Sequence, residues 1–265
     1  MKSPLTAEHR PVAEMIRGVQ SVMASLRSAV LLISTPPEVW RPETASSLGG
    51  VIVVPQDMTE KDLEILKNRN LPFLLFSESE LPGPRLRLGQ REAARHMTEQ
   101  LLRLGHRRIA LLSGYDNTLD APKRQGVHEA LREAGIDPAQ APEFSANGQE
   151  GGIFQAAHDL LRVVPRPTAV IAFDDSLGSI LSIQARRHDG IRVPEELSIV
   201  SFHDWPYLNY LEPALTTVRF EFFSSGQRAA EALNRAALTG EAVSDIHFPP
   251  AYRPGQTIGP APAGS

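Results

Sequence analysis

The chain has 265 residues, of which 42% are hydrophobic and 22% charged, ordinary values for a globular protein of one large domain or two lobes. Its formal net charge of −4 provides no basic field to attract nucleic acid, and the absence of cysteine excludes disulfides and thiolate metal sites. The sequence has no apolar run long enough to span a membrane and no apolar signal-peptide core at its start, so we expect a cytoplasmic protein without membrane contact.

Apolar patterns in the first hundred residues predict helices that alternate with short strands. Apolar residues at steps of three and four indicate a helix over 8–27 and a second one around 63–66. Apolar runs without alternation indicate strands buried on both faces. The predicted strands are 29–33, 50–54 and 72–76. Residues 36–48, which are rich in Pro, Ser and Thr, predict a loop.

The segment around Gly105 marks the expected change from one lobe to the next. Ala94, Met97 and Leu101 lie at helical spacing, and Gly105 follows them. Glycine takes the left-handed cap conformation at little cost, so the predicted helix ends there. The apolar run at 109–112 then predicts a buried strand that begins a new sheet.

The same succession of helix, glycine and strand recurs in the remaining chain. Predicted helices end near Gly135 and Gly190, and two more are expected around 154–161 and 224–238. The predicted strands are 168–173, 197–202, 215–218 and 246–248. The tail from Pro249 contains several prolines and glycines and is expected to lie irregularly on the surface. Strands alternating with helices predict an α/β fold with parallel sheets and right-handed crossovers.

Two polar pairs, Asp174-Asp175 and His203-Asp204, end two of the predicted parallel strands. Ligands bind beyond the carboxyl ends of strands in open α/β sheets, so these four side chains are candidates for lining a pocket. One alternative is that Asp175 and Asp204 cap the helices that follow them. Another is a hard metal ion bound through oxygen, but such residues on short loops are common by chance, so we expect no metal and no cofactor.

Four stretches of the chain, taken together and in this order, carry a resemblance to a known family. They are Leu-Gly-His-Arg-Arg-Ile-Ala at 104–110, Pro-Thr-Ala-Val-Ile-Ala at 167–172, Val-Pro-Glu-Glu-Leu-Ser-Ile-Val at 193–200 and Pro-Ala-Leu-Thr-Thr-Val at 213–218. The chain resembles the effector-binding core of the LacI/GalR (lactose-repressor) family of transcription regulators over nearly its whole length.

The resemblance implies a periplasmic-binding-protein-like fold. Such a fold has two doubly wound parallel-sheet lobes joined by a multi-strand hinge, with a ligand cleft between them. We accordingly expect an amino-terminal lobe of 1–106 with 217–241 and a carboxyl-terminal lobe of 107–216 with 242–265. A homodimer is also implied.

The family carries an amino-terminal helix-turn-helix headpiece that binds DNA. We expect that headpiece to be absent from this chain, and the first strand of the family's core is not visible either. Related regulators attach a winged-helix headpiece of the GntR type to the same core. DNA is therefore expected to be bound only through a headpiece outside these residues, of either the LacI or the GntR type.

The resemblance also implies a set of ligand-binding residues. Phe173 stands where the family often has an asparagine, and His203 where it often has an acid that binds ligand hydroxyls. Lys123, three residues before Gly126, stands where it often has an arginine. The remaining predicted ligand-binding residues are Glu80, Asp174 and Trp205. In the family's sugar sensors acids and amides bind the neutral hydroxyls, whereas these positions offer a ring and two side chains that can donate to an anion. The resemblance therefore predicts a sugar or sugar-derived effector that carries a carboxylate, a phosphate or an aromatic ring, rather than a plain neutral hexose bound in the usual manner.

The predicted function is therefore a sensor that binds a small effector and makes or breaks no bond, so the chain is not expected to be an enzyme. One alternative is a solute-binding protein of a transport system on the same fold. Another is an enzyme that uses Asp174, Asp175, His203 and Asp204. The chain has no phosphate-binding glycine loop, no zinc-binding helix motif and no nucleophile-elbow motif to favour the enzyme.

Overall fold

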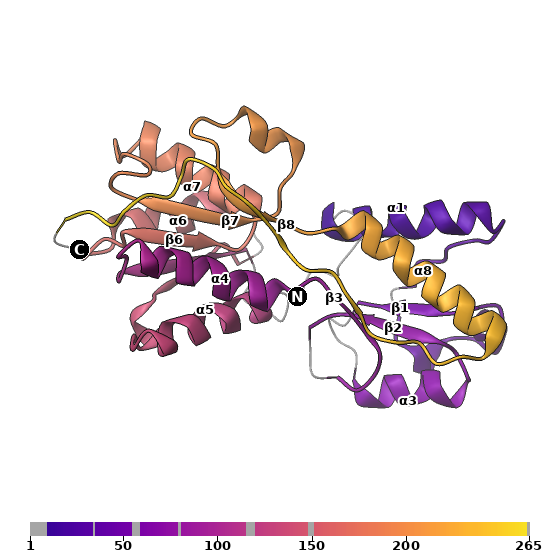
Figure 1. Ribbon diagram of the computed structural model, residues 1–265. Coiled ribbons are helices and arrows are strands. Elements are labelled where there is room, and N and C mark those ends of the chain that lie inside the picture. Colours follow the sequence, from indigo (N-terminus) through magenta and orange to yellow (C-terminus); the bar gives the residue numbers. More distant parts are fainter. Residues whose placement is uncertain are drawn as a thin grey trace. The chain divides into compact units, whose positions relative to one another are not determined.

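The computed structural model describes residues 10–33, 35–54, 59–78, 81–114, 120–147 and 151–263. The chain divides into two compact units, Met1–Gly89 with Glu221–Pro249 and Gln90–Phe220 with Pro250–Ser265. The chain therefore passes from one unit to the other three times, and each unit is described by itself below (Figure 1). No helix among the described residues is long and apolar enough to cross a membrane.

The first unit contains a four-stranded, fully parallel sheet with the strand order β1-β2-β3-β9. Its strands are β1 (Val51–Val53), β2 (Phe73–Phe76), β3 (Arg85–Arg87) and β9 (Ile246–His247). The helix α3 (Glu60–Asn68) begins at a capping box, in which Thr59 and Asp62 exchange side-chain-to-backbone hydrogen bonds. It buries Leu63 and Leu66 completely against the strands, which gives this unit its apolar core.

Two long helices of the first unit, α1 (Arg10–Ser25) and α8 (Phe222–Thr239), lie side by side (Figure 1). Each has a glycine at the crossing, Gly18 in α1 and Gly226 in α8. A Cβ atom on Gly18 would overlap the carbonyl of Phe223, and one on Gly226 would overlap the carbonyl of Met15. The two backbones can approach this closely only because neither glycine has a side chain.

The second unit contains a six-stranded sheet with the order β10-β8-β7-β6-β4-β5. Its strands are β4 (Ile109–Ser113), β5 (Glu143–Ser145), β6 (Ala169–Ala172), β7 (Ser198–Phe202), β8 (Thr216–Arg219) and β10 (Ala251–Arg253). Only β10 pairs antiparallel. Every residue of β4, β6 and β7 is buried, as the absence of alternation in their sequences predicted.

Four helices of the second unit form two packed pairs, α4 with α5 and α6 with α7. They are α4 (Gln90–Arg103), α5 (Ala121–Glu133), α6 (Gly152–Arg162) and α7 (Asp175–Arg187). Gly126 lets α5 approach α4, because a Cβ atom there would overlap the carbonyl of Arg91. The predicted helix end at Gly105 is confirmed: α4 stops at Arg103, and Gly105 has a φ of +91°.

Several predicted elements differ from the structure. Residues 29–33 form no strand, because no neighbouring chain among the described residues supplies ladder hydrogen bonds, and Leu31 and Leu32 are 58% and 61% exposed. The expected loop at 36–48 contains the short helices Pro37–Val39 and Pro42–Ser46. Two further short helices, Pro138–Gln140 and Pro206–Tyr210, lie in the second unit.

The tail is more ordered than its composition indicated. Instead of lying irregularly, residues 251–253 form β10, which pairs with β8, and Thr257 donates a side-chain hydrogen bond of 2.6 Å to the carbonyl of Ile199 in β7. Pro and Gly lower the intrinsic preference for a strand, but here the exposed edge of β8 supplies hydrogen-bond partners that decide the conformation.

The unit boundaries also differ from the predicted lobes. We predicted a lobe boundary after residue 106, but in the structure this boundary lies after Gly89, because α4 packs on α5 and belongs to the second unit. The division predicted between 216 and 217 falls after Phe220. The one predicted between 241 and 242 falls after Pro249, because β9 pairs with β3 of the first unit.

Candidate functional site

The candidate site lies where the parallel strands of the second unit end. Phe173 and Asp174 follow β6, and His203, Asp204 and Trp205 follow β7, its neighbour in the sheet. Carboxyl ends of parallel strands meet at one edge of a sheet, and loops at that edge are where ligands bind in open α/β folds. Lys123 reaches the same edge from the first turn of α5, as its hydrogen bond to Phe173 shows.

Lys123 points inward and is held by two acceptors. Its Nζ atom donates to Oδ1 of Asp120 at 3.0 Å and to the carbonyl oxygen of Phe173 at 2.8 Å. The same ammonium lies 5.8 Å from the ring centroid of Phe173 and 5.6 Å from that of Phe202. With only 5% of the residue exposed, this lysine supplies a buried, compensated cation beneath the site.

The two aspartates that follow β6 have different roles. Asp174 caps α7, because its Oδ1 atom accepts hydrogen bonds from the backbone N–H of Leu177 at 2.9 Å and from Oγ of Ser176 at 2.6 Å. Asp175 does not cap the helix, so the prediction that it does is wrong. Its carboxylate turns toward the loop after β7 instead.

Asp175, His203 and Tyr207 form a cluster. Nδ1 of His203 lies 3.5 Å from Oδ1 of Asp175, and the Tyr207 hydroxyl donates to the other carboxylate oxygen. Burial raises the pKa of Asp175, but the hydrogen bonds from His203 and Tyr207 outweigh burial and hold that pKa below its ordinary value. Burial, together with the hydrogen bond to Asp175, raises the pKa of Tyr207. The cluster therefore consists of the ionised carboxylate of Asp175 and the two side chains that donate to it, His203 and Tyr207.

Aromatic rings surround the imidazole of His203. Its ring centroid lies 6.4 Å from that of Trp205 and 5.8 Å from that of Phe220, both edge to face. Phe220 also stacks on Phe202, and Phe202 meets Phe173 edge to face. His203 has a φ of +74°, a conformation that costs free energy for a side-chain-bearing residue and persists only where its surroundings fix it. The result is a continuous aromatic wall along this edge.

The structure brings five of the six predicted ligand-binding residues to this one edge of the second unit. They are Lys123, Phe173, Asp174, His203 and Trp205. Glu80 lies outside the described residues. The prediction that Asp204 caps a helix is wrong, because Oδ2 of Asp204 binds Nε of Arg253 at 3.3 Å and the short helix after it has no side-chain cap.

Sequence reasoning missed three residues of this edge: Asp120, Tyr207 and Phe220. Asp120 is the residue before α5 and Tyr207 lies in the one-turn helix Pro206–Tyr210, and at neither position does periodicity mark a side chain as facing a site. Phe220 carried a usable signal, because it follows β8 just as His203 follows β7. Among the described residues, no group of three or more His, Cys, Asp or Glu side chains could hold a metal ion.

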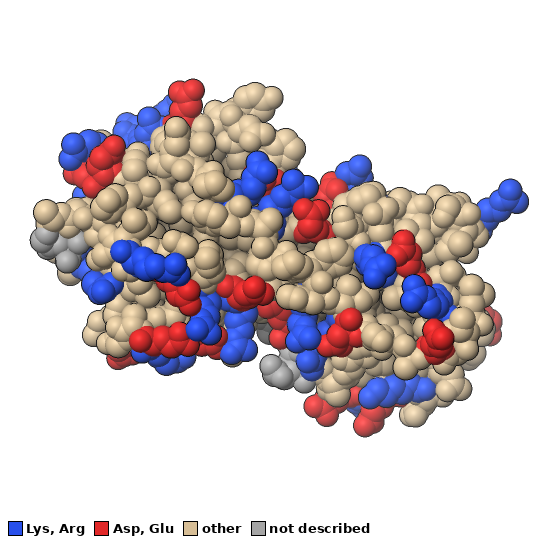
Figure 2. All heavy atoms as spheres, in the orientation of Figure 1, with Lys and Arg blue, Asp and Glu red and all other residues tan. Residues whose placement is uncertain are grey.

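Charges of both signs are interspersed over the face seen in Figure 2, and blue and red side chains often lie next to each other. The net charge is −4, and this face presents no broad basic surface of the kind that binds nucleic acid.

Comparison with known proteins agrees with this architecture. The sequence model of the family "periplasmic binding protein-like domain" matches residues 98–258. The regulator GalS of Salmonella typhimurium is 31% identical over 205 residues, which cover 76% of this chain and 60% of that protein. A LacI family regulator from Enterococcus faecium, solved with bound ribose, has a TM-score of 0.82 at 21% identity, with 97% of each chain covered. The lac repressor dimer bound to operator and an anti-inducer has a TM-score of 0.83 at 20% identity, over 96% of this chain and 91% of that one.

The chain belongs to the family of periplasmic-binding-protein-like domains, in the form that LacI/GalR transcriptional regulators use as their effector-binding core. It spans 51% to 72% of the length of the curated relatives it matches. Those relatives are transcriptional regulators rather than enzymes. The three aspartates of the alternative enzyme interpretation each have a protein partner: Asp174 accepts from Leu177, Asp175 from Tyr207, and Asp204 binds Arg253.

Proposed function

We propose that this chain senses an acidic or aromatic small molecule through the edge of the second unit that carries His203, Trp205 and Phe220. The effector shifts the populations of two conformations of the chain, because it binds one of them better than the other. No bond of the effector is made or broken.

The observation that carries this proposal is that the carboxylates of the edge already have partners in the protein. Asp120 binds Lys123, Asp174 caps α7, and Asp175 accepts from Tyr207 and faces His203. Each protein donor occupies part of a carboxylate's acceptor capacity, which leaves less of it for the hydroxyls of a neutral sugar. Aromatic rings and the imidazole of His203 lie at the same edge, and these groups suit an aromatic or anionic ligand.

We further propose that the effector signal reaches DNA through a headpiece of LacI or GntR type that lies outside these residues, and that the chain works as a homodimer. The relatives that support this are longer than the chain, and the similar lac repressor structure is a dimer on its operator. The face seen in Figure 2 carries no broad basic surface of its own.

A thermal-shift panel tests the ligand class. The panel contains neutral hexoses, sugar acids, sugar phosphates and aromatic carboxylates. A ligand present at 100 times its Kd adds about 2.7 kcal/mol to the free energy of unfolding. For a chain of this size that corresponds to roughly 5–11 °C in the unfolding midpoint. The proposal fails if neutral hexoses give this shift while the acids and aromatic compounds give none.

A pair of variants tests the residue assignment. The variant His203→Ala should lose most of the shift given by the active compound. His247→Ala, which changes an exposed histidine of the first unit, should keep it. Equal responses of the two variants would remove His203 from the site.

A further inference from the structure

The cluster of Asp175, His203 and Tyr207 fixes where the imidazole of His203 carries its hydrogen. Asp175 is only 7% exposed, and its Oδ1 atom lies 3.5 Å from Nδ1 of His203, while its other oxygen accepts from the Tyr207 hydroxyl. A carboxylate can only accept hydrogen bonds, so the hydrogen of the neutral imidazole is held on Nδ1. Nε2 of the neutral ring then carries a lone pair.

The packing around His203 keeps the ring in this orientation. Its imidazole meets Trp205 and Phe220 edge to face, with ring centroids 6.4 and 5.8 Å away, and the side chain is 10% exposed. A rotation of the ring by half a turn would put a carbon atom where Nδ1 now faces Asp175. That rotation would lose the contact with the carboxylate, so the arrangement of the two ring nitrogens is set by the fold.

Around neutral pH, His203 is the member of this cluster whose charge can change. Hydrogen bonds from His203 and Tyr207 outweigh burial and hold the pKa of Asp175 below its ordinary value, so its carboxylate stays ionised. Burial raises the pKa of Tyr207, so its hydroxyl stays protonated. Histidine is the side chain that ordinarily titrates between pH 5 and 8. The cluster therefore carries one negative charge when the imidazole is neutral and no net charge when it is protonated.

The cations beside this cluster are already paired with acids. Lys123 of α5 binds Asp120 at 3.0 Å, and Arg253 of β10 binds Asp204 at 3.3 Å. Asp174, which caps α7, adds a further negative charge. With a neutral imidazole, the charges of these described residues thus leave the edge negative, and an anion that approaches it is repelled.

We propose that Asp175 makes the binding of an acidic effector proton-linked: it holds the hydrogen of the neutral imidazole on Nδ1, and His203 takes up a proton on Nε2 when the effector binds. This inference rests on the acidic effector of the proposed function and adds the residue that sets the charge of the site. An N–H bond forms at Nε2, and a water or buffer acid gives up the proton, so the effector itself is unchanged. Asp175 is a positioning residue, because it acts through His203.

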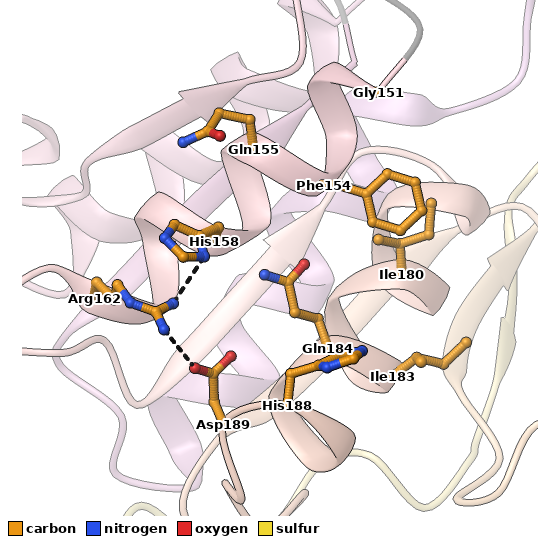
Figure 3. A pocket seen from close by; sticks show the side chains of 10 residues that line it. All are labelled: Gly151, Phe154, Gln155, His158, Arg162, Ile180, Ile183, Gln184, His188 and Asp189. Atoms are coloured by element: carbon orange, nitrogen blue, oxygen red, sulfur yellow. Dashed lines mark hydrogen bonds and ion pairs between the residues drawn. The ribbon is translucent and has the colours of Figure 1, made fainter.

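A histidine in the groove between α6 and α7 shows the opposite arrangement (Figure 3). There Arg162 donates to Nδ1 of His158 at 2.9 Å and binds Oδ1 of Asp189 at 3.2 Å. Because a guanidinium only donates, Nδ1 of His158 is an acceptor and the hydrogen of its neutral ring lies on Nε2. His158 therefore provides an internal reference for the other tautomer.

Nitrogen NMR on the whole chain with 15N-labelled histidine tests the tautomer without any ligand. At pH 8 the ring of His203, assigned by its loss in His203→Ala, should carry its hydrogen on Nδ1, and that of His158 on Nε2. The matched control is Asp204→Asn, which removes a carboxylate of the same edge that binds Arg253, and it should leave His203 unchanged. A wild-type His203 ring with its hydrogen on Nε2 overturns the inference.

Two matched compounds test the proton linkage. Phenyl β-D-glucuronide carries a carboxylate and an aromatic ring, and phenyl β-D-glucoside is its neutral counterpart. Calorimetry in two buffers of different ionisation enthalpy measures the protons taken up. The glucuronide should bind at least about threefold more tightly at pH 6 than at pH 8, with proton uptake, and the glucoside should show no such dependence. Equal affinity of the glucuronide at both pH values, or no binding at either, overturns the inference.

The variant Asp175→Asn gives a result that structural damage would not. It removes the negative charge at nearly constant size, so it should bind the glucuronide more tightly than the wild type does at pH 8, and the difference between pH 6 and pH 8 should shrink. Binding of the glucoside should stay the same. Weaker binding of the glucuronide to this variant at pH 8 contradicts the inference.

The thermal-shift panel separates this inference from the proposed function. Acidic compounds that stabilise the chain equally at pH 6 and pH 8 would leave the proposed function standing and reject the proton linkage alone. A response confined to neutral hexoses would reject the acidic effector itself, and the proton linkage with it.

Discussion

The Nζ atom of Lys123 lies 3.0 Å from Oδ1 of Asp120, and the two side chains are only 6% and 7% exposed. Breaking a buried ion pair of this kind costs far more free energy of folding than breaking a pair on the surface. Removing one partner leaves the other charged in a medium that solvates it poorly, which is strongly destabilising even where the intact pair contributes little.

We expect Lys123→Met to lower the free energy of unfolding by about 3–5 kcal/mol, measured by urea titration, because Asp120 and the Phe173 carbonyl each lose the hydrogen bond from Lys123. Lys61→Met is the matched control. Lys61 pairs with Glu38 at 3.7 Å but is 76% exposed, so its loss should cost no more than about 1 kcal/mol. An equal loss of unfolding free energy in the two variants would show that the buried pair is no more important for stability than the exposed one. Asp120→Asn added to Lys123→Met should recover part of the loss.

The Asp175 cluster predicts a dependence of stability on acid pH. The pKa of Asp175 is lowered in the folded chain, so its contribution to stability is complete above its unfolded value of about 3.9 and is lost as the pH falls through the folded pKa. Tyr207→Phe removes one donor and should move this loss to higher pH. Tyr210→Phe, at a position that is 88% exposed, should leave it unchanged. Acid titrations of the unfolding midpoint for the three chains measure the difference.

His106 predicts a second dependence on pH, nearer to neutrality. Its Nδ1 and Nε2 atoms lie 2.9 Å from Oγ1 of Thr168 and 3.0 Å from the carbonyl oxygen of Gly259. A carbonyl only accepts, so Nε2 donates to Gly259 and, in the neutral ring, Nδ1 accepts from Thr168. Burial lowers the pKa of His106, although the bond to Gly259 opposes that effect.

Because the folded pKa of His106 is the lower one, its contribution to stability is complete above the unfolded value of about 6.5 and declines as the pH falls from there toward the folded pKa. His106→Gln should keep a donor and an acceptor while removing the titration. We therefore expect its unfolding free energy to vary less with pH over this range. A slope identical to that of the wild type would assign the effect to other groups.

The close crossing of α1 and α8 predicts a local effect of one methyl group. Gly226→Ala should destabilise the first unit by about 1–3 kcal/mol, because the new Cβ overlaps the Met15 carbonyl and the helices must separate. Gly49→Ala serves as the control, since its Cβ would lie 3.9 Å from that of Ala237, an ordinary contact. Hydrogen exchange should show faster exchange in α1 and α8 of Gly226→Ala and unchanged protection in β6 and β7. Uniform loss of protection across both units would contradict this localisation.

The sequence was most informative about elements whose own residues determine them. The apolar runs of β4, β6 and β7 predicted buried parallel strands because every side chain in them is apolar or small. The strands β3, β5 and β10 escaped detection, because each contains polar residues and no apolar run, so its conformation depends on a neighbouring edge rather than on its own pattern. The apolar run 29–33 shows the converse, since it has strand propensity but no partner.

At the candidate site, residue types could be predicted but not their partners. The strand-end positions of Phe173, Asp174 and His203 followed from the alternation of strands and helices. The inward turn of Lys123 toward Asp120 could not be derived, because a lysine near the start of a helix usually faces solvent. Nor could the sequence decide which of Asp174 and Asp175 caps α7, since both can do so and only the position of Tyr207 separates them.

The three passages of the chain between the two units have a consequence for synthesis on the ribosome. The first sheet is incomplete until β9 at 246–247 has emerged, and β8 in the second sheet keeps an open edge until β10 at 251–253 has emerged. A nascent chain that has reached residue 240 therefore has neither unit finished, although it already contains both helix pairs of the second unit. Exposed strand edges are sites of aggregation, so we expect the nascent chain to need chaperones until the last stage of translation. At that stage β9 and β10, which are close in sequence, complete the two sheets almost together.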